Sequence, residues 1–521
     1  MTHITGNTYI DALIGLIPIA FVFFSMLKLR MPSYVASPVA LAVSAALAAA
    51  VWKMPLGLIP GAIAEGVMLG LFPIVWVVFS AILAYNISLE SGAMEKLKRL
   101  LMSISPDRRV LVLILAFAFG GFLEAAAGFG TAVAIPAGMM VAIGFEPVFA
   151  TVVCLVANTI PVAFGVVGIP VITLAAVTGL PLHDLTVFTA LQLLPFVILL
   201  PLLLLLLVAK SIRGLRGVVM LSIFAGLAFA AGQTLVAWMA GPELAAFAGS
   251  LLSLAVIVIW CRIWPVKPAN NKESTALSLE KTDVSIEKNH TAGAFQACSP
   301  YILILALVLI TRLIPGLAFL GKKPLTMEYM FYNGADAKPT QFALLTNPGT
   351  ILFIAAIIGG FIQGLQLRTI LLMIVKTFKQ IAKTIITVLS IVSLAKVMGF
   401  SGMVNSIAGG IASLTGRYFP LFSPFIGAFG TFLTGSDTSS NVLFGELQRQ
   451  TAVAIHSDPS WLAAANASGA TAGKMISPQS IAIASSATGL KASEGQILSL
   501  TVRYSLVSVA LLGLIVFVFG K

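Results

Sequence analysis

Long apolar runs dominate the chain, and their lengths predict the first set of elements. A helix needs about 20 apolar residues to cross the hydrocarbon core of a bilayer. Ten segments are close to that length or exceed it, which predicts an all-α polytopic membrane protein with about ten transmembrane helices. These segments are 8–28, 34–52, 60–88, 186–209, 217–240, 244–262, 298–317, 349–366, 375–399 and 496–519.

Two other apolar regions are interrupted by a short polar or glycine-rich stretch. In residues 109–145, LEAAAGFG separates two apolar stretches of about 13 residues, each too short for a crossing. In residues 418–445, TGSDTSSN lies between a half-length apolar stretch and a shorter one. This pattern predicts two re-entrant hairpins. The alternative counts the hairpins as spans and gives about 12–14 continuous spans.

Two long segments predict broken helices. NTIP (158–161) interrupts residues 148–178, and small polar residues around NASGATAGK (466–474) interrupt residues 461–487. Proline removes a backbone donor and bends a helix. Irregular backbone persists in a membrane only inside protein or beside a water-filled cavity. The two breaks are therefore candidate parts of a binding site, although a purely structural bend explains the same pattern.

A shift of 310 residues relates the two halves of the chain. The matched strings are AFGGFLEAAAG (118–128) with AFGTFLTGSDT (428–438), Ser91-Gly92 with Ser401-Gly402, and TGL (178–180) with TGL (488–490). Internal repeats are the usual construction of secondary transporters. The predicted organisation is a first repeat (1–216), two connecting helices (217–264), a cytoplasmic loop (265–297) and a second repeat (298–521).

Basic residues predict the orientation, because cytoplasmic loops carry an excess of Lys and Arg. With the N-terminus outside, the cytoplasm holds three basic connections: the one with Lys28 and Arg30, the stretch 91–108, and the one with Lys210, Arg213 and Arg216. The equivalent of 91–108, residues 401–419, then lies outside and carries one basic residue, Arg417. The polar loop 265–297 also lies inside. An odd number of crossings separates equivalent elements, so the repeat is predicted to be inverted.

Composition excludes several classes of protein. Hydrophobic types make up 59% of the 521 residues and charged types only 10%, whereas a soluble domain carries about 25% charged residues. This excludes a soluble enzyme, a disordered protein and a nucleic-acid binder, and assigns the net charge of +12 to membrane-protein loops. Three cysteines give no disulfide framework. The N-terminus shows no cleavage signature, so we expect it to be retained.

Two acidic residues lie at the predicted hairpin tips. Glu124 has apolar flanks, whereas Asp437 lies among hydroxyl residues. An ionisable residue at bilayer depth costs about 2.5–3.5 kcal/mol on insertion scales and is a functional candidate by default. A wet loop end for Glu124 and a helix cap for Asp437 are the structural alternatives. Of these two candidate proton carriers we expect Glu124 to act, because hydroxyl groups should keep Asp437 ionised.

The second hairpin tip and the two breaks supply candidate ligands for an anion. The N-terminus of a half-helix offers N–H groups and the positive end of a dipole. The candidate substrate-binding residues are Asn158, Thr159, Ser436, Thr438, Ser439, Asn441 and Lys474. Three roles for Lys474 stay open: neutralising a bound anion, pairing with Glu124 or Asp437, and extending to the membrane interface.

An intramembrane serine hydrolase is the alternative from another class. GFSG (399–402) places Ser401 in a GxSG string, but such an enzyme needs a general base, normally histidine. The four histidines lie in polar loops, at His3, His183, His290 and His456. The sequence contains no HExxH string, and we expect neither a metal nor a cofactor.

Three long strings resemble those of the bacterial L-lactate permease family. They are EAAAGFGTAVAIPAG (124–138), NTIPVAFGVVGIP (158–170) and GSDTSSNVLFG (435–445), and the resemblance covers nearly the whole chain. It implies uptake of L-lactate, D-lactate or glycolate with a proton across the bacterial inner membrane. It also implies kinship with transporters whose hairpins and broken helices form a mobile domain that moves like an elevator.

The expected function is therefore proton-coupled transport of a small 2-hydroxymonocarboxylate by alternating access. A co-transported proton cancels the charge of the anion and removes a cost of about 2.3 kcal/mol per 100 mV of membrane potential. The expected partners are the monocarboxylate, the proton and the lipid bilayer, without nucleic acid, and the sequence leaves a homo-oligomer open. A sodium-coupled or antiporting carrier of another small carboxylate is the alternative.

Overall fold

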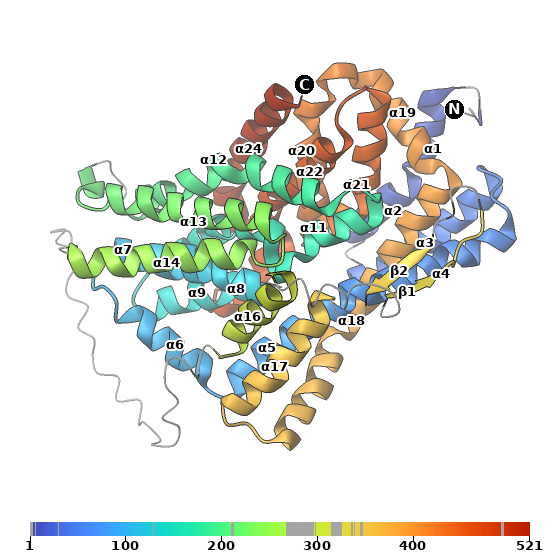
Figure 1. Cartoon of the computed structure of the whole chain (residues 1–521). Coiled ribbons are helices and arrows are strands. Elements are labelled where there is room, and N and C mark those ends of the chain that lie inside the picture. Colours follow the sequence, from blue (N-terminus) through green and yellow to red (C-terminus); the bar gives the residue numbers. More distant parts are fainter. Residues whose placement is uncertain are drawn as a thin grey trace.

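A computed structural model shows a nearly all-helical protein (Figure 1). It describes residues 4–5, 7–29, 31–128, 130–209, 213–266, 296, 299–313, 326–334, 337, 339–343, 347–490 and 494–520. Within these ranges, ten helices are long and apolar enough to cross a membrane. The predicted class, an all-α polytopic membrane protein, is confirmed. The predicted loop 265–297 lies almost wholly outside the described residues.

The first half of the chain ends with two antiparallel connecting helices, α13 and α14 (Figure 1). Its elements are α1 (Thr8–Gly15), α2 (Ile17–Leu27), α3 (Ser33–Ala50), η1 (Leu56–Leu58), α4 (Ile59–Leu69), η2 (Gly70–Val75), α5 (Trp76–Glu90), α6 (Ala93–Met102), α7 (Arg108–Val112), η3 (Leu113–Phe119), α8 (Gly120–Ala126), α9 (Thr131–Ala142), α10 (Pro147–Ala157), η4 (Pro161–Phe164), α11 (Gly165–Thr178), α12 (Leu182–Ala209), η5 (Arg213–Leu215), α13 (Val219–Met239) and α14 (Ala245–Ile263).

The second half adds a small antiparallel β-hairpin that no apolar pattern predicts. The elements of the second half are α16 (Ser299–Leu313), β1 (Thr326–Tyr329), β2 (Thr340–Ala343), α17 (Pro348–Ile362), α18 (Leu367–Ser401), α19 (Met403–Thr415), η7 (Gly416–Tyr418), α20 (Phe419–Thr434), α21 (Asp437–Ala454), α22 (Pro459–Lys474), α23 (Pro478–Ala487) and α24 (Glu494–Phe519).

Eight of the ten predicted spans coincide with membrane-length helices. Of the other two, 349–366 is a helix of 15 residues, α17, and the described part of 298–317 is α16, also of 15 residues, while residues 314–317 lie outside the described residues. Conversely, Arg108–Ala126 and Pro161–Thr178 reach 19 and 18 residues, although they were expected to be halves of interrupted elements. The second hairpin was also expected to end at 445, but α21 continues to Ala454.

The predicted position of the second helix break is wrong. α22 is continuous through Asn466 and Ser468, and the interruption follows at 475–477, before Pro478. Both polar side chains find partners on neighbouring elements, Asn441 and Gln192 respectively, so they do not disturb their own helix. A residue that precedes proline is disfavoured in the helical conformation, which explains where the helix stops.

Two elements of 35 residues, Leu56–Glu90 and α18, form an antiparallel pair. We call the helices of this pair, α4, α5 and α18, together with α3 and α17, the scaffold. An added Cβ at Gly66 or Gly70 would clash with Ser393 or Leu389 of α18, respectively. Towards the other end, Asn86 donates a hydrogen bond to Thr377 Oγ1 at 2.9 Å. Rising numbers on one element thus meet falling numbers on the other.

The shift of 310 residues also relates backbone geometry in the two halves. Gly92 and Gly402 have φ of +73° and +88° and precede α6 and α19. Gly179 and Gly489 have φ of +68° and +71° before the long helices α12 and α24. Glycine adopts this conformation without steric cost. The two 35-residue elements are equivalent in the same way, and their antiparallel packing supports the predicted inversion.

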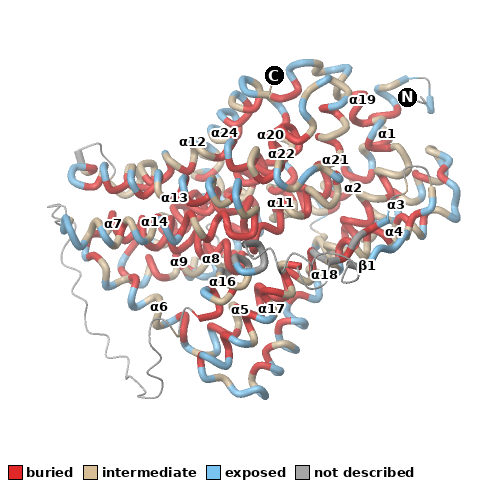
Figure 2. Tube along the Cα trace, viewed as in Figure 1, coloured by how far each residue is buried: buried red, intermediate tan, exposed pale blue. Residues whose placement is uncertain are grey.

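A second group of helices contains both hairpins and both helix breaks, and we call α7–α11 together with α20–α23 the hairpin body. Its helices pack closely because small residues face each other. Added Cβ atoms at Gly469 and Gly473 of α22 would clash with the backbone of Pro424 and Ala428 of α20. Figure 2 shows that buried residues concentrate around α8, α11 and α22. The centre of the hairpin body is therefore buried, whereas its α20 exposes Phe422 and Phe429.

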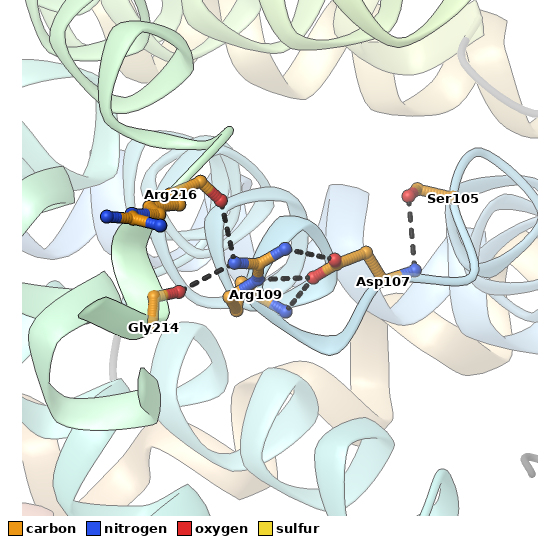
Figure 3. A network of polar contacts seen from close by, with 5 residues as sticks. All are labelled: Ser105, Asp107, Arg109, Gly214 and Arg216. Carbon is orange, nitrogen blue, oxygen red and sulfur yellow. Dashed lines mark hydrogen bonds and ion pairs between the residues drawn. The ribbon is translucent and has the colours of Figure 1, made fainter. Parts of the chain in front are cut away.

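A buried ion pair fixes the entrance of the first hairpin (Figure 3). Arg109 Nη2 lies 2.7 Å from Asp107 Oδ2, and both residues are buried. Arg109 Nη1 also donates to the carbonyls of Gly214 and Arg216, at 2.6 and 3.2 Å. The network joins two connections that were both predicted to lie in the cytoplasm.

Contacts at the two ends of the scaffold join segments that were predicted to lie on the same side of the membrane. At one end, Trp52 Nε1 donates to Ser406 Oγ at 3.4 Å; Trp52 ends the predicted span 34–52, and Ser406 lies in 401–419, predicted outside. At the other end, Ser91 donates to Gln363 Oε1 at 2.8 Å; Ser91 lies in 91–108, predicted inside, and Gln363 lies near the end of the predicted span 349–366.

Cysteine labelling tests the inverted topology. We predict that a cysteine at Ser103 is labelled only from the cytoplasm and one at Ser413 only from outside, in a background without native cysteines. Both positions are exposed, so reagent access depends on sidedness. Labelling of both positions from the same side would contradict the inverted repeat.

Candidate functional site

A cavity of about 300 Å³ lies between the hairpin body and the scaffold. One wall contains both hairpin tips, the first helix break and α23, and the other contains α3, η2, α5 and α18. Six of the predicted site residues line this cavity: Glu124, Ser436, Asp437, Thr438, Ser439 and Lys474. Residues 350 positions apart in the chain are thus brought together in one concave site.

Glu124 and Lys474 form an ion pair in the cavity wall. Lys474 Nζ donates to Glu124 Oε1 at 2.9 Å, and their side chains are 12% and 3% exposed, respectively. Of the three roles left open for Lys474, the structure shows pairing with Glu124. Glu124 Oε2 is buried and accepts no hydrogen bond within the described part of the chain. One carboxylate oxygen is therefore committed to lysine while the other is not.

Gly165, the first residue of α11, makes room for this pair. A Cβ at Gly165 would lie 2.8 Å from Glu124 Oε1. The backbone at the first break therefore approaches the carboxylate directly. This close approach explains why the broken helix begins with glycine.

The tip of the second hairpin presents the N-terminus of α21 to the cavity. Gly435 has φ of +72° and turns the chain, and Ser436 caps the helix by accepting a hydrogen bond from Ser439 N at 3.3 Å. Thr438, in the first turn, lines the cavity. Oriented N–H groups and a hydroxyl at this end favour a carboxylate.

The environment expected for Asp437 is wrong. The carboxyl is buried, and neither oxygen accepts a hydrogen bond from the residues that the structure describes. The neighbouring hydroxyls bond to backbone groups instead: Thr434 donates to Gly430 O at 2.8 Å, and Ser440 donates to Gly427 O at 2.8 Å. Hydroxyl groups in a hairpin satisfy their own turn first, so they do not hold Asp437 ionised.

Three predicted ligands do not line the cavity: Asn158, Thr159 and Asn441. α10 ends at Ala157, and the side chains of Asn158 and Thr159 are buried at the break without a hydrogen-bond partner in the described ranges. The predicted break is thus present, but its polar side chains point elsewhere.

Asn441 belongs to a buried network of hydrogen-bonded side-chain amides that supports the first helix break. Asn441 accepts a hydrogen bond from Asn466 Nδ2 at 2.9 Å and donates to Pro170 O at 3.1 Å. Gln448 Nε2 donates to Asn466 Oδ1 at 3.3 Å. All three amides are 0% exposed. This amide network holds α21 and α22 against α11, where Val166 has φ of +46°.

The scaffold wall contains site residues that the sequence analysis did not identify. These are Ser33, Tyr34, Lys383, Thr384 and Thr387, and α23 adds Gln479 and Ser480. The signal in the sequence was KTIIT (383–387), which places a cation and two hydroxyls on one face of a helix. Because residues 375–399 otherwise have the composition of a plain apolar span, this string by itself does not predict a site.

The comparison with known proteins covers nearly the whole chain. Two solved transporters match at 15% identity: MtrF of Neisseria gonorrhoeae (TM-score 0.47, 88% of this chain and 83% of that chain) and YdaH of Alcanivorax borkumensis (TM-score 0.44, 89% and 85%). Among curated proteins, an L-lactate permease of Streptococcus iniae is 40% identical over 87% of this chain and 93% of its own. An L-lactate permease of Bacillus subtilis (34%; 99% and 97%) and the glycolate permease GlcA of Escherichia coli (34%; 98% and 96%) also match.

The family model for L-lactate permease matches residues 11–520. Permeases move solutes across membranes, and the ten membrane-length helices fit that activity. Together with the identities of the bacterial relatives, this match shows that the chain belongs to the L-lactate permease family and is a multi-pass transporter of the bacterial inner membrane, not an enzyme.

Proposed function

We propose that this protein takes up L-lactate, and related 2-hydroxymonocarboxylates such as D-lactate and glycolate, together with a proton. The L-lactate and glycolate permeases among its relatives support this substrate class. The observation that carries the coupling is the Glu124–Lys474 pair in the cavity. A cation for the substrate and a carboxyl for the proton lie 2.9 Å apart.

The substrate carboxylate competes with Glu124 for Lys474. While Glu124 is ionised, it occupies the ammonium group. A proton on Glu124 weakens that contact and lets Lys474 pair with the substrate. Thr438 and the first turn of α21 then donate hydrogen bonds to the same carboxylate. Proton binding thus precedes or accompanies substrate binding.

This exchange keeps the net charge of the cavity wall formed by the hairpin body constant. In the empty state, the charges of Glu124 and Lys474 cancel. In the loaded state, the substrate carboxylate balances Lys474, and Glu124 is neutral. An uncompensated buried charge costs about 3–5 kcal/mol, so a state with only one of the two solutes bound is disfavoured. Asp437, which lacks donors in the described part of the chain, stays protonated in both states.

We infer an elevator-like movement of the hairpin body against the scaffold. The residues proposed to bind the substrate, Thr438 and Lys474, and the proposed proton carrier, Glu124, all lie on the hairpin body. The opposing wall is formed by scaffold helices that are joined by the ion pair between the buried Glu65 and the partly buried Lys396 at 3.1 Å. A site with all its principal ligands on one body can move with that body without losing them.

Uptake of radiolabelled lactate into proteoliposomes tests the function. We expect an imposed proton gradient directed into the vesicles, with the outside more acidic, to drive lactate accumulation in the absence of sodium. Accumulation that instead requires a sodium gradient at clamped pH would replace proton coupling by sodium coupling. Absence of lactate transport, with another carboxylate accumulated, would reject the substrate class.

Substitution of the proposed proton carrier separates coupling from exchange. We predict that Glu124→Gln abolishes pH-driven accumulation but retains lactate exchange. In the parent, apparent affinity for lactate should rise as pH falls, because protonation frees Lys474, and this dependence should be lost in Glu124→Gln. Accumulation by Glu124→Gln equal to that of the parent would show that Glu124 does not carry the proton.

Asp437, the second carboxyl that lines the cavity, provides the control for Glu124→Gln. If Asp437 is neutral throughout, Asp437→Asn replaces one neutral group of similar size by another. We therefore predict that Asp437→Asn retains accumulation under a pH gradient, measured in the same vesicles. Loss of accumulation with exchange retained would transfer the coupling role to Asp437.

Substitutions at two residues of α21 separate binding of the substrate from structural support of the site. We predict that Thr438→Val raises the KM for lactate about tenfold without loss of protein, because a hydrogen bond to a charged group is worth roughly 1.5–3 kcal/mol. Asn441→Leu leaves partners on α22 and α11 unsatisfied and should lower thermal stability, at a cost of about 1–3 kcal/mol for each buried group. An unchanged KM in Thr438→Val, measured by uptake kinetics, would place the carboxylate elsewhere.

A further inference from the structure

The scaffold wall of the cavity contains a cation that the coupling scheme does not use. Lys383 lies on α18, is exposed and lines the same cavity as Glu124 and Lys474. Within the described ranges it has no carboxylate partner, whereas Lys474 is paired. The wall that remains in place therefore presents an available ammonium group to any anion in the cavity.

The surroundings of Lys383 supply orientation and donors. Its Nζ lies 5.1 Å from the ring centre of Tyr34, a cation–π contact that holds the side chain beside α3. Thr387 Oγ1 donates to Lys383 O at 3.0 Å and lies 3.3 Å from Ser33 Oγ, so these two hydroxyls join α3 and α18 at this place and do not donate to the cavity. Thr384 lines the cavity next to the lysine. The ammonium group of Lys383 and the hydroxyl of Thr384 are a suitable donor set for a carboxylate.

The position of this cluster along the transport path follows from the topology. Ser33 is the first residue of α3 and follows the connection that contains Lys28, which was predicted to be cytoplasmic. Lys383 is exposed where Lys474 is largely buried. The cluster therefore lies between the Glu124–Lys474 pair and the water on that side.

We propose that Lys383, positioned by Tyr34 and accompanied by Thr384, forms a second binding position for the substrate carboxylate, the scaffold anion site, through which the anion passes between Lys474 and the cytoplasm. This inference rests on the proposed function. When Glu124 loses its proton and pairs again with Lys474, it displaces the substrate carboxylate. The scaffold anion site then receives the carboxylate on a wall that does not return with the hairpin body.

The chain offers a matched control on the same helix. Lys379 lies one turn before Lys383, is also exposed and does not line the cavity. Lys383→Gln and Lys379→Gln remove the same charge from α18, so they alter the overall field of the protein equally. Only Lys383→Gln removes a cation from the cavity.

The experiment measures lactate transport in vesicles, with substrate added at the face from which a cysteine at position 103 is labelled. We expect Lys383→Gln to raise the KM roughly two- to fivefold at low salt, as for a partly exposed charge contact, and Lys379→Gln to leave it unchanged. The difference should shrink at high salt because exposed charges are screened. Lys383→Arg should restore the parent KM.

Several outcomes would overturn the proposal. Equal KM values for Lys383→Gln and Lys379→Gln would remove the scaffold anion site while leaving proton-coupled lactate transport intact. A change in maximal rate alone, without a change in KM or in salt dependence, would assign Lys383 a structural role. Failure of the parent protein to transport lactate would reject the proposed function and this site with it.

Discussion

The ion pair between Glu124 and Lys474 is the interaction on which the arrangement of the site depends. Two charged groups in an apolar helical protein are stable only if they meet each other with good geometry. That requirement draws the end of α22 to the tip of the first hairpin, 350 positions away in the chain. The same contact leaves the pair open to competition from a third charged group, because each partner can be replaced by a ligand of the same sign.

Close backbone contact makes this geometry possible. Gly165 lets the broken helix approach the carboxylate, and Gly469 and Gly473 let α22 approach α20. In a membrane, helices associate through packing of small residues and interhelical hydrogen bonds rather than through exclusion of water. The amide network of Asn441, Gln448 and Asn466 supplies those hydrogen bonds without breaking α22. Polar residues therefore have two separate tasks in the hairpin body: some face the cavity and others hold its walls.

This division explains which site residues could be predicted. Glu124 and Asp437 were identified because an ionisable residue at bilayer depth is costly and is therefore a functional candidate by default. Ser436 and Thr438 were identified because hydroxyls gather at the start of a half-helix. Asn441 has the same local signature, yet it faces away from the cavity. Local sequence states that a side chain is polar but not which neighbour satisfies it.

The sequence by itself determined the membrane class, most of the spans, the two interrupted regions and the relation between the halves. The first three follow from the length of apolar runs, which act locally, and the fourth from strings that recur after a shift of 310 residues. Only the tertiary structure decided that Lys474 pairs with Glu124, that Asp437 lacks donors in the described part, and that Lys383 faces the same cavity. These facts depend on distances between elements far apart in the chain, and such distances are set by helix packing, which no local pattern encodes.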